Sequence, residues 1–232
     1  MVAKCPPFGR GTFRPASREI KSGRFLHWRL QRAGKWNFRF NMQLNPQSIL
    51  TLAEVREVLG DLKPRRGSHN KFLDEIIFRL TCCCGLHTTE IANLSLDDLL
   101  LEASRPAVRI KGKRTRFAPL WIDAPTRDAL VDWIVVRRGE GAENADPVVE
   151  SSTGRRFSQR GIYDRWKTAV RCLDEPRRSE LSSTCGRWTF VAHALRYGLS
   201  QRQVASAAGV ATEYLDRYKP LVKRAQVLDL FG

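Results

Sequence analysis

Apolar side chains recur at helical spacing along most of the chain from residue 49 onward. The clearest case is the stretch 51–62, which predicts an amphipathic helix whose apolar face is formed by Leu52, Val55, Val58 and Leu59. Thr51 stands immediately before the first of these residues, and Glu54 follows it by three positions. Because this is the spacing of a capping box, we expect the helix to begin directly after Thr51.

Further helices and one β-hairpin are predicted downstream. Residues 71–84 are strongly apolar and predict a buried helix that ends at a tight turn on Gly85, and a second helix is expected over 88–103. The stretch 107–122 has β character and predicts a hairpin with basic residues around Gly112. More helices are expected at 124–138, at 158–173 and, two or three in number, between 185 and 232, with a polar loop at 174–184. The sequence therefore predicts a mainly α fold with a small antiparallel β-sheet.

The beginning of the chain has a different composition. Residues 1–50 hold ten lysine and arginine residues against a single acid, Glu19, and aromatic side chains are interleaved with them. Residues 1–48 are therefore expected to form a basic, aromatic-rich arm in front of a domain at 49–232. Arginines with aromatics suit phosphate contact and base stacking, whereas the alternative is a solvated tail that binds nothing specific. The DNA contacts expected in this arm are Arg24, Arg29, Lys35 and Arg39.

The net charge of +16 favours a polyanionic partner, and nucleic acid is the usual one. An anionic membrane surface is the weaker alternative, because no long basic amphipathic helix stands out. No run of about 18 apolar residues is present, so no transmembrane span and no membrane partner are expected. The first residues also lack the apolar stretch of a signal peptide, which predicts an intracellular protein with mostly reduced cysteines.

Three of the six cysteines are consecutive, at positions 82–84. None of the six forms a C-x-x-C pair, and neighbouring positions on a helix point about 100° apart, so the triplet cannot converge on one tetrahedral metal ion. Buried cysteine packs as a small apolar residue. We therefore expect core packing for the cysteines, no metal site and no cofactor.

Several motifs, in this order, resemble the catalytic domain of the tyrosine recombinases, the phage integrase family. The resemblance runs from about Ile49 to Tyr218 and rests on LTLAEVREVL, CGLHTTEIANLSLDDL, IKGKRTRFAPL, TCGRWTFVAHALRYGLSQRQVASAAGV and YLDRY. It implies the family's fold, duplex DNA as the partner, and a homo-oligomer or other recombinase subunits on that DNA. It also implies a bacterial or phage-encoded protein of the cytoplasm, associated with the nucleoid. The family normally carries a DNA-clamping domain in front, which we expect to be absent or replaced by the basic arm.

The resemblance assigns catalytic positions residue by residue. Four of them hold the family's residue type: the acid Glu90, the hairpin lysine Lys111, the arginine Arg187 and the nucleophile Tyr218. Three differ from the family: His87 stands at the first catalytic arginine, Thr184 at the histidine of H-x-x-R, and Val210 at the later histidine or tryptophan. Tyr214 is an alternative nucleophile whose position fits the family spacing less well.

The three changed positions predict a weakened active site. In the family the tyrosine attacks a DNA phosphodiester, two arginines clamp its oxygens, and the lysine protonates the leaving oxygen. His87 offers one N–H and only a partial charge near neutral pH, and the loss of one preorganised donor typically costs about 10²–10³ in rate. We therefore expect a DNA-binding protein with a degenerate active site and a regulatory or accessory role, in transcription or recombination, on a mobile element.

Two alternatives stay open from the sequence. The first is an active site-specific recombinase that cleaves through Tyr218, with the missing donor supplied by Arg114, Arg116 or Arg178. The second is a scaffold in which residues 199–218 form a helix-turn-helix unit, with Val204, Ala208, Val210, Leu215 and Tyr218 as core positions. In the domain after the arm, the expected DNA contacts are Lys111, Lys113, Arg114, Arg116, Arg187, Arg202 and Arg217.

Overall fold

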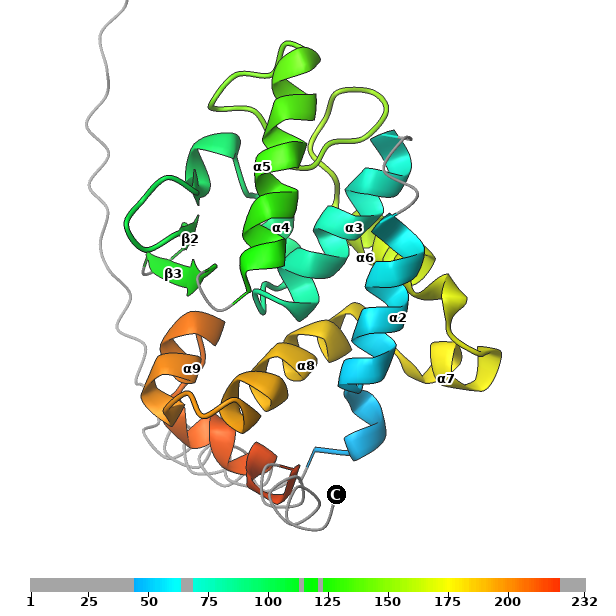
Figure 1. The fold of residues 1–232 in the computed structure, drawn as a ribbon, viewed down its shortest axis with the longest axis vertical. Helices are drawn as coiled ribbons and strands as arrows, with labels where there is room; N and C mark the ends of the chain where they lie inside the picture. The colour runs from blue at the N-terminus through cyan, green and yellow to red at the C-terminus, as the bar shows by residue number, and fades with distance from the viewer. Residues whose placement is uncertain (1–43, 64–68, 113–114, 121–122, 222–232) are drawn as a thin grey trace, which may run out of the picture. The chain divides into compact units, whose positions relative to one another are not determined.

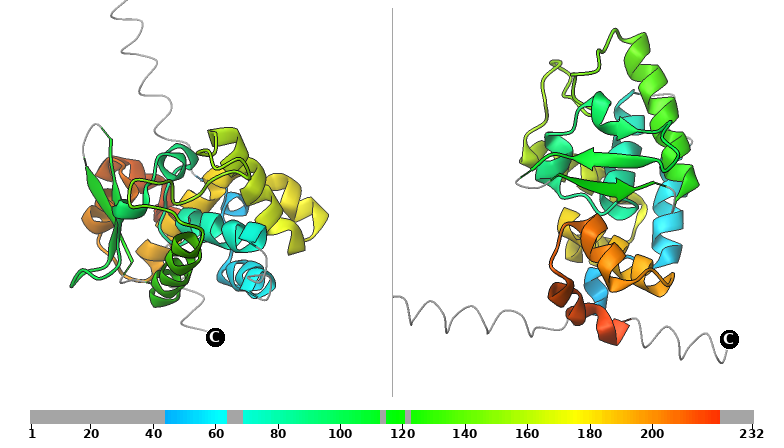
Figure 2. Two further views of the ribbon diagram at one scale, coloured as in Figure 1. Left: turned by 90° about the horizontal axis from the view of Figure 1, so that it is seen from above. Right: turned by 90° about the vertical axis from the view of Figure 1, so that its left-hand side faces the viewer.

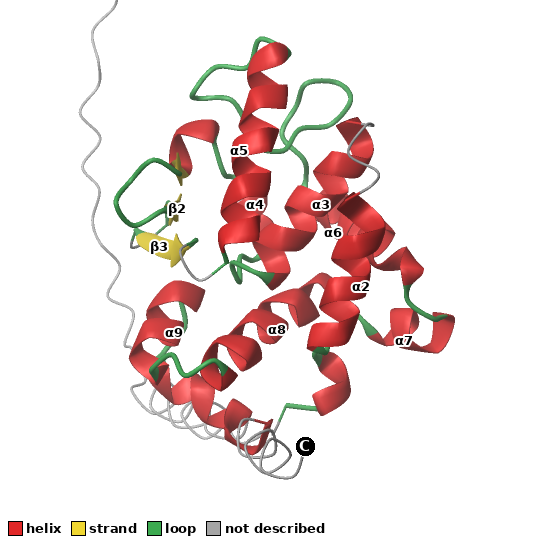
Figure 3. Ribbon diagram, viewed as in Figure 1, coloured by secondary structure: helices red, strands yellow, loops and turns green. Residues whose placement is uncertain are grey.

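Helices make up most of the described residues, and one small antiparallel sheet lies beside them (Figure 3). The structure is a computed structural model that describes residues 44–63, 69–112, 115–120 and 123–221. The mainly α fold with a small antiparallel sheet, predicted from the sequence, is confirmed.

Helix α3 (His69–Cys82) lies at the centre of the larger hydrophobic core. Its apolar residues are almost fully inaccessible to solvent, among them Ile76, Ile77, Phe78 and Leu80. The helices in contact with it include α2 (Leu52–Leu62), α4 (Thr88–Ala92), α5 (Ala124–Gly139), α6 (Gln159–Ala169) and α8 (Ser183–Arg196) (Figure 1). Because α3 is enclosed on several sides, some of its charged side chains are buried as well, and Glu75 and Arg79 pair with each other at 2.8 Å.

The start of α2 agrees with the sequence in detail. The Thr51 hydroxyl accepts from the Glu54 N–H at 3.2 Å, and the Glu54 carboxylate accepts from the Thr51 N–H at 2.6 Å. The predicted capping box is therefore confirmed. The predicted apolar face is not fully buried: Val58 is inaccessible, whereas the Leu52 residue is 53% exposed because it stands in the first turn, where the helix extends into solvent.

The helix expected over 88–103 is much shorter than predicted. Helix α4 spans only Thr88–Ala92 and is followed by the 3-10 helix η3 (Leu96–Asp98). The backbone N–H groups of Leu96 and Asp97 donate to the carbonyls of Asp146 and Asn144, at 2.9 Å each, instead of to a preceding helical turn. Tertiary hydrogen bonds thus end the helix at a point where its apolar pattern continues.

The sheet consists of β1 (Leu99–Leu100), β2 (Ala107–Ile110) and β3 (Arg116–Pro119), in the order β1-β2-β3 with antiparallel neighbours. Strands β2 and β3 form the predicted hairpin, in which Ile110 pairs with Arg116 and Ala107 with Pro119. Strand β1 was not predicted, since its residues fall within the expected helix. The right-hand view of Figure 2 shows the sheet beside the orange helix α9 (Gln201–Ala208), which contacts β3.

Helix α9 and the 3-10 helix η5 (Thr212–Tyr218) close a second hydrophobic core against α8. Its buried residues include Leu44, Phe190, Val204, Leu215 and Tyr218. Only the first helix of the expected helix-turn-helix unit is an α-helix, and Val210 is half-buried rather than a core residue. In a helix-turn-helix unit the second α-helix enters the major groove. Here the 3-10 helix η5 stands at that place, and its residues Leu215 and Tyr218 are buried.

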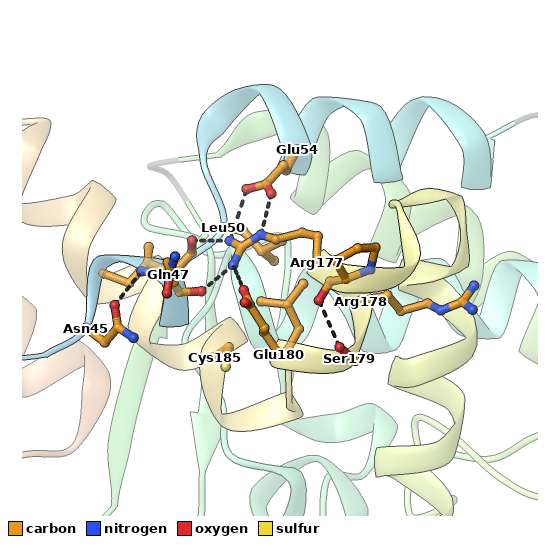
Figure 4. A network of polar contacts seen from close by, with 12 residues as sticks. Asn45, Gln47, Leu50, Glu54, Arg177, Arg178, Ser179, Glu180 and Cys185 are labelled. Atoms are coloured by element: carbon orange, nitrogen blue, oxygen red, sulfur yellow. Dashed lines mark hydrogen bonds and ion pairs between the residues drawn. The ribbon is translucent and has the colours of Figure 1, made fainter.

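The polar stretch predicted as a loop at 174–184 contains a short helix, α7 (Glu175–Glu180), opened by Pro176. Arg177 of this helix reaches across to the start of the domain (Figure 4). Its Nε atom donates to Glu54 at 2.5 Å and its Nη2 atom to the Ile49 carbonyl at 2.6 Å, and a further bond reaches the Gln47 carbonyl beside η1 (Pro46–Ser48). These bonds hold α7 in place and explain why a polar segment is ordered there.

The prediction that cysteines pack in the core is confirmed for Cys82, Cys84 and Cys185, which are buried, and Cys83 and Cys172 are half-buried. Burial raises the pKa of Cys82 to about 12. In the described ranges no three His, Cys, Asp or Glu side chains are grouped to hold a metal ion. Within the same ranges, each helix is too short or too polar to cross a membrane.

Candidate functional site

Glu90 is held at the start of α4 by the turn that precedes it. Gly85 has a φ of +70°, and a Cβ there would lie 2.4 Å from the Phe190 ring, so only glycine fits this turn. His87 then caps α4: its backbone N–H donates to Glu90 Oε2 at 2.7 Å, and its Nδ1 atom lies 2.9 Å from the Thr89 hydroxyl. The imidazole of His87 is thus engaged with its own helix.

Two arginines from distant parts of the chain meet at the same oxygen of Glu90. Arg116 of β3 donates through Nη2 to Oε2 at 2.6 Å, and Arg187 of α8 donates through Nη1 to Oε2 at 3.3 Å. Both guanidinium groups are mostly buried. Burial lowers the pKa of Arg187, an effect that Glu90 opposes and the neighbouring Arg116 strengthens. The pair therefore carries two positive charges against one carboxylate.

The C-terminal end of α9 accepts hydrogen bonds from the same two arginines. Arg116 donates to the carbonyl of Ala207, and Arg187 donates to the carbonyl of Ala208. Carbonyls at a helix C-terminus carry partial negative charge and attract cations. Gly209 then ends α9 in the left-handed conformation, with a φ of +64°. Two neighbouring carbonyls thus fix the positions of two neighbouring guanidinium groups.

Lys111 reaches the same region from the end of β2. Its Nζ atom lies 2.9 Å from Asp98 and 3.7 Å from Asp97, and its side chain is 57% exposed. Although burial opposes ionisation of Asp98, hydrogen bonds from Lys111 and Arg109 outweigh it and lower the pKa of this carboxyl. A cavity of about 750 Å³ opens here, and its lining includes Glu90, Lys111, Arg116, Ser206, Gly209 and Val210. Its wall combines two cations with polar side chains, a composition suited to an anion.

The three positions that differ from the family pattern have different surroundings. Val210 lines the cavity. His87 lies beside Glu90, and burial together with the charge of Arg187 lowers its pKa, so its imidazole is neutral near pH 7. Thr184 lies half-buried in the first turn of α8, three residues before Arg187. None of the three side chains brings a permanent charge to this region.

Tyr218 lies in η5 with its side chain fully buried. Within the described ranges its hydroxyl has no hydrogen-bond partner. Burial raises the pKa of the phenol, and the neighbouring Tyr214, whose ring centre is 6.4 Å away, adds to this. The side chain is near enough to Arg187 to feel its charge, but it does not belong to the cavity lining.

The other expected DNA contacts are dispersed. Arg202 is exposed on α9 and lines an adjacent cavity of about 610 Å³ together with Phe117. Arg217 donates to the Tyr214 hydroxyl at 2.9 Å and lies over the Trp188 ring, so it packs between η5 and α8 rather than at the Lys111 cavity. The remaining predicted contacts lie outside the described residues: Arg24, Arg29, Lys35, Arg39, Lys113 and Arg114.

Of the three arginines expected to supply a missing donor, Arg114 lies outside the described residues, and of the other two Arg116 is the one at the site. Arg178 pairs with Glu175 on α7, which Figure 1 shows on the opposite side of the domain from α9. From the sequence alone, Arg116 cannot be chosen over the neighbouring Lys113 and Arg114 as the residue that faces the site, because the register of the hairpin is not known. Once β3 is placed, strand alternation puts Arg116 on the same face as the buried Ala118 and opposite to the exposed Phe117.

The matching family model and the similar curated proteins point to the same family. A family model described as "Phage integrase family" matches residues 48–212. Tyrosine recombinase XerC of Pseudomonas syringae pv. tomato is 30% identical over 138 residues, which cover 60% of this chain and 44% of the relative. Tyrosine recombinase XerD of Pseudomonas putida is 25% identical over 170 residues, covering 69% and 52%. The chain thus spans about half the length of these curated relatives.

Solved structures agree with the fold. The crystal structure of XerA recombinase has a TM-score of 0.64 at 15% identity, and the match covers 79% of this chain and 63% of that one. The Tn1549 transposon integrase in complex with transposon right end DNA has a TM-score of 0.55 at 17% identity, covering 83% and 69%. At this level of identity the similarity shows only that the helices and strands have the same arrangement. This arrangement is the fold expected from the sequence motifs.

Proposed function

Since the chain belongs to the phage integrase family, whose members include the tyrosine recombinases, we propose that it binds duplex DNA and cleaves it weakly or not at all. The DNA-binding face in this proposal carries Lys111, Arg116 and Arg202. Its role is regulatory or accessory, in transcription or recombination on a mobile element, in association with the nucleoid. A second copy of the chain or other recombinase subunits on the same DNA are the further partners.

The observation that carries this proposal is the burial of Tyr218. A phenol that attacks a phosphodiester must reach the phosphorus atom and lose its proton. Here the side chain is fully buried, and burial raises its pKa. At the same time His87 is a helix cap with a lowered pKa, and Val210 contributes no polar contact. Phosphate binding is therefore better supported by these side chains than strand cleavage.

The charge of the chain supports DNA as the partner. The net charge is +16, and Lys111 and Arg116 line one cavity while Arg202 lines the next. Ser206 of α9 lines both cavities, so the two lie next to each other along the same helix. Among the similar structures, the XerH site-specific recombinase is bound to palindromic difH substrate and the Tn1549 integrase to transposon right end DNA.

The first experiment measures affinity for duplex DNA over a range of salt concentrations. Each phosphate neutralised by the protein releases counterions, so log K falls by about 0.9 per tenfold rise in salt for each contact. A duplex binder shows a steep slope, and a flat response overturns the proposal. Fragments of the host genome selected by binding then supply a preferred sequence. On that sequence, a nicked suicide substrate is expected to trap no covalent adduct.

The alternative function is an active site-specific recombinase. The observation that favours it is the survival of Glu90, Lys111 and Arg187 in one neighbourhood with Tyr218 close to Arg187. In that case the nicked substrate traps an adduct that is lost in Tyr218→Phe. A double variant, His87→Arg with Thr184→His, tests for a decayed active site: the appearance of adduct only in this variant supports the binding function, whereas adduct in the wild type supports the enzyme.

A further inference from the structure

The charges around Glu90 do not balance. Arg116 and Arg187 bring two full positive charges to one carboxylate oxygen, and the carbonyls at the end of α9 add only partial negative charge. Lys111 lies at the same cavity, although Asp98 and Asp97 compensate its charge. The excess positive charge is therefore at the two arginines, next to a cavity open to solvent.

Of the two arginines, Arg116 is the one that faces the cavity. Arg116 belongs to the cavity lining together with Glu90 and Lys111, whereas Arg187 does not. A guanidinium group has five N–H donors. The bonds to Glu90 and Ala207 use two of those of Arg116, so three N–H groups are not engaged by the described residues. These are enough for two parallel bonds to the oxygens of a phosphate group.

Position 87 does not supply that contact. The Nδ1 atom of His87 lies 2.9 Å from the Thr89 hydroxyl, so one ring nitrogen faces its own helix. A neutral imidazole retains at most one directed N–H and has no charge for an anion. The guanidinium that the family pattern leads one to expect at position 87 is thus lacking there, while the Arg116 guanidinium donates to Glu90 Oε2, the same oxygen that accepts from the His87 backbone N–H.

We infer that Arg116 is the arginine that binds a DNA backbone phosphate in this cavity, in place of the arginine missing at position 87. The inference rests on the proposed function, because it assumes that DNA lies on this face. Glu90 and the Ala207 carbonyl orient the guanidinium, and Arg187 donates to the same oxygen of Glu90. Lys111 provides the second cation of the site. Glu90 is then an internal counterion that a bound phosphate displaces in part.

The test is the salt dependence of binding to a fluorescent random-sequence duplex, for the wild type and Arg116→Gln. Loss of one phosphate contact lowers the slope of log K against log salt by about 0.9. A charge-assisted contact of this kind corresponds to a loss of affinity of about 10- to 100-fold. Arg116→Lys keeps the charge without the planar fork and is expected to fall in between.

Arg165→Gln is the matched control. It removes the same charge from an arginine that, like Arg116, bonds one carboxylate and one backbone carbonyl. Arg165 lies on α6 and pairs with Asp74 at 2.7 Å. Its slope is expected to equal that of the wild type. An unchanged slope in Arg116→Gln, or a reduced slope in His87→Gln instead, overturns the inference while the proposed function survives. A flat salt response in the wild type overturns the proposed function itself.

Glu90→Gln separates phosphate binding from a bracing role. The amide oxygen of glutamine can still accept the bond from Arg116 Nη2 and orient the guanidinium, while the competing negative charge is removed. If Arg116 binds phosphate, DNA binding is therefore at least as tight as in the wild type. If Arg116 and Glu90 only brace the fold, Glu90→Gln weakens binding in the same way as Arg116→Gln, and the inference fails. Circular dichroism establishes that each variant is folded. Should Arg116→Gln not fold, the binding of Glu90→Gln decides between the two outcomes.

Discussion

Gly209 lies so close to the guanidinium of Arg116 that a Cβ at position 209 would come within 2.5 Å of the Arg116 Nε atom. The same glycine ends α9 with a φ of +64°, in a region that side chains with a Cβ rarely adopt. The C-terminal end of α9 and the position of the Arg116 guanidinium therefore both require a residue without a Cβ atom at position 209. The lack of a side chain at Gly209 thus makes room for a side chain from β3.

Gly209→Ala is expected to destabilise the domain by about 1–2 kcal/mol, the usual cost of a left-handed conformation for an L-residue. It is also expected to displace Arg116 and weaken DNA binding. Urea unfolding measures the first effect and the fluorescent duplex the second. Gly60→Ala is the control: Gly60 lies inside α2 with open space around it, so alanine there should stabilise the domain by about 0.5–1 kcal/mol. Equal changes in stability in the two variants would contradict the conclusion that position 209 requires glycine.

Tyr218→Phe is expected to leave the domain as stable as the wild type or more stable. The hydroxyl is buried without a partner among the described residues, and a buried unsatisfied polar group costs about 1–3 kcal/mol. Phenylalanine keeps the ring and its packing. Urea unfolding of the two proteins provides the comparison, and a loss of more than about 1 kcal/mol would reveal a bond to the hydroxyl.

Tyr214→Phe is the matched control for that variant, because the Tyr214 hydroxyl accepts from Arg217 Nη1 at 2.9 Å. Its removal is expected to cost about 0.5–1.5 kcal/mol, the net value of an ordinary hydrogen bond. The two tyrosines lie in the same short helix, so the opposite signs of their effects would depend on hydroxyl bonding alone.

Local sequence signals predicted those elements whose stability is local. The capping box at Thr51 fixed the start of α2, and the hairpin followed from its β character and turn residues. The helix expected at 124–138 is likewise found as α5, with Pro125 in its first turn, where the proline nitrogen needs no hydrogen bond. In each of these cases the determining residues lie within a few positions of one another.

The elements that were mispredicted depend on distant parts of the chain. The helix expected to 103 ends at Ala92 because the 144–146 segment accepts its next hydrogen bonds. Helix α7 forms in a polar stretch because Arg177 reaches residues more than a hundred positions earlier. The candidate site follows the same rule: the sequence identified Glu90 and Arg187 and named Arg116 among several basic residues, but the contact between Arg116 and Glu90 emerges only once β3 lies against α9.

Arg177→Ala is expected to destabilise the domain by about 1.5–3 kcal/mol, the range for hydrogen bonds that involve charged groups. Arg177 is mostly shielded from solvent and bonds Glu54 and the Gln47 carbonyl, which Figure 4 labels, as well as the Ile49 carbonyl. Urea unfolding measures the change. Arg160→Ala is the control, since its pair with Asp164 is largely exposed and should contribute no more than about 0.5 kcal/mol. Similar losses in both variants would argue against a special role for Arg177.

His193 is expected to make the stability of the domain sensitive to mild acid. Its Nε2 atom lies 2.8 Å from the Leu50 carbonyl, which can only accept, so the proton is on Nε2 and Nδ1 is bare. Nδ1 is buried and unpartnered among the described residues, so a second proton has no favourable place. Burial accordingly lowers the pKa of His193; the Leu50 carbonyl opposes this and the nearby Arg196 adds to it.

The sign of the pH effect follows from this shift. The unfolded chain has the ordinary histidine pKa of 6.5 and the folded chain a lower one, so the unfolded state binds more protons between the two values. Stability should therefore be full above about pH 6.5 and fall as the pH drops, by at most about 1.4 kcal/mol per pH unit for one histidine. Unfolding in urea between pH 7.5 and 5 as rough limits measures the slope. His193→Gln should reduce this slope without abolishing it, because His87 also has a lowered pKa, and an unchanged slope would exclude His193 as its source.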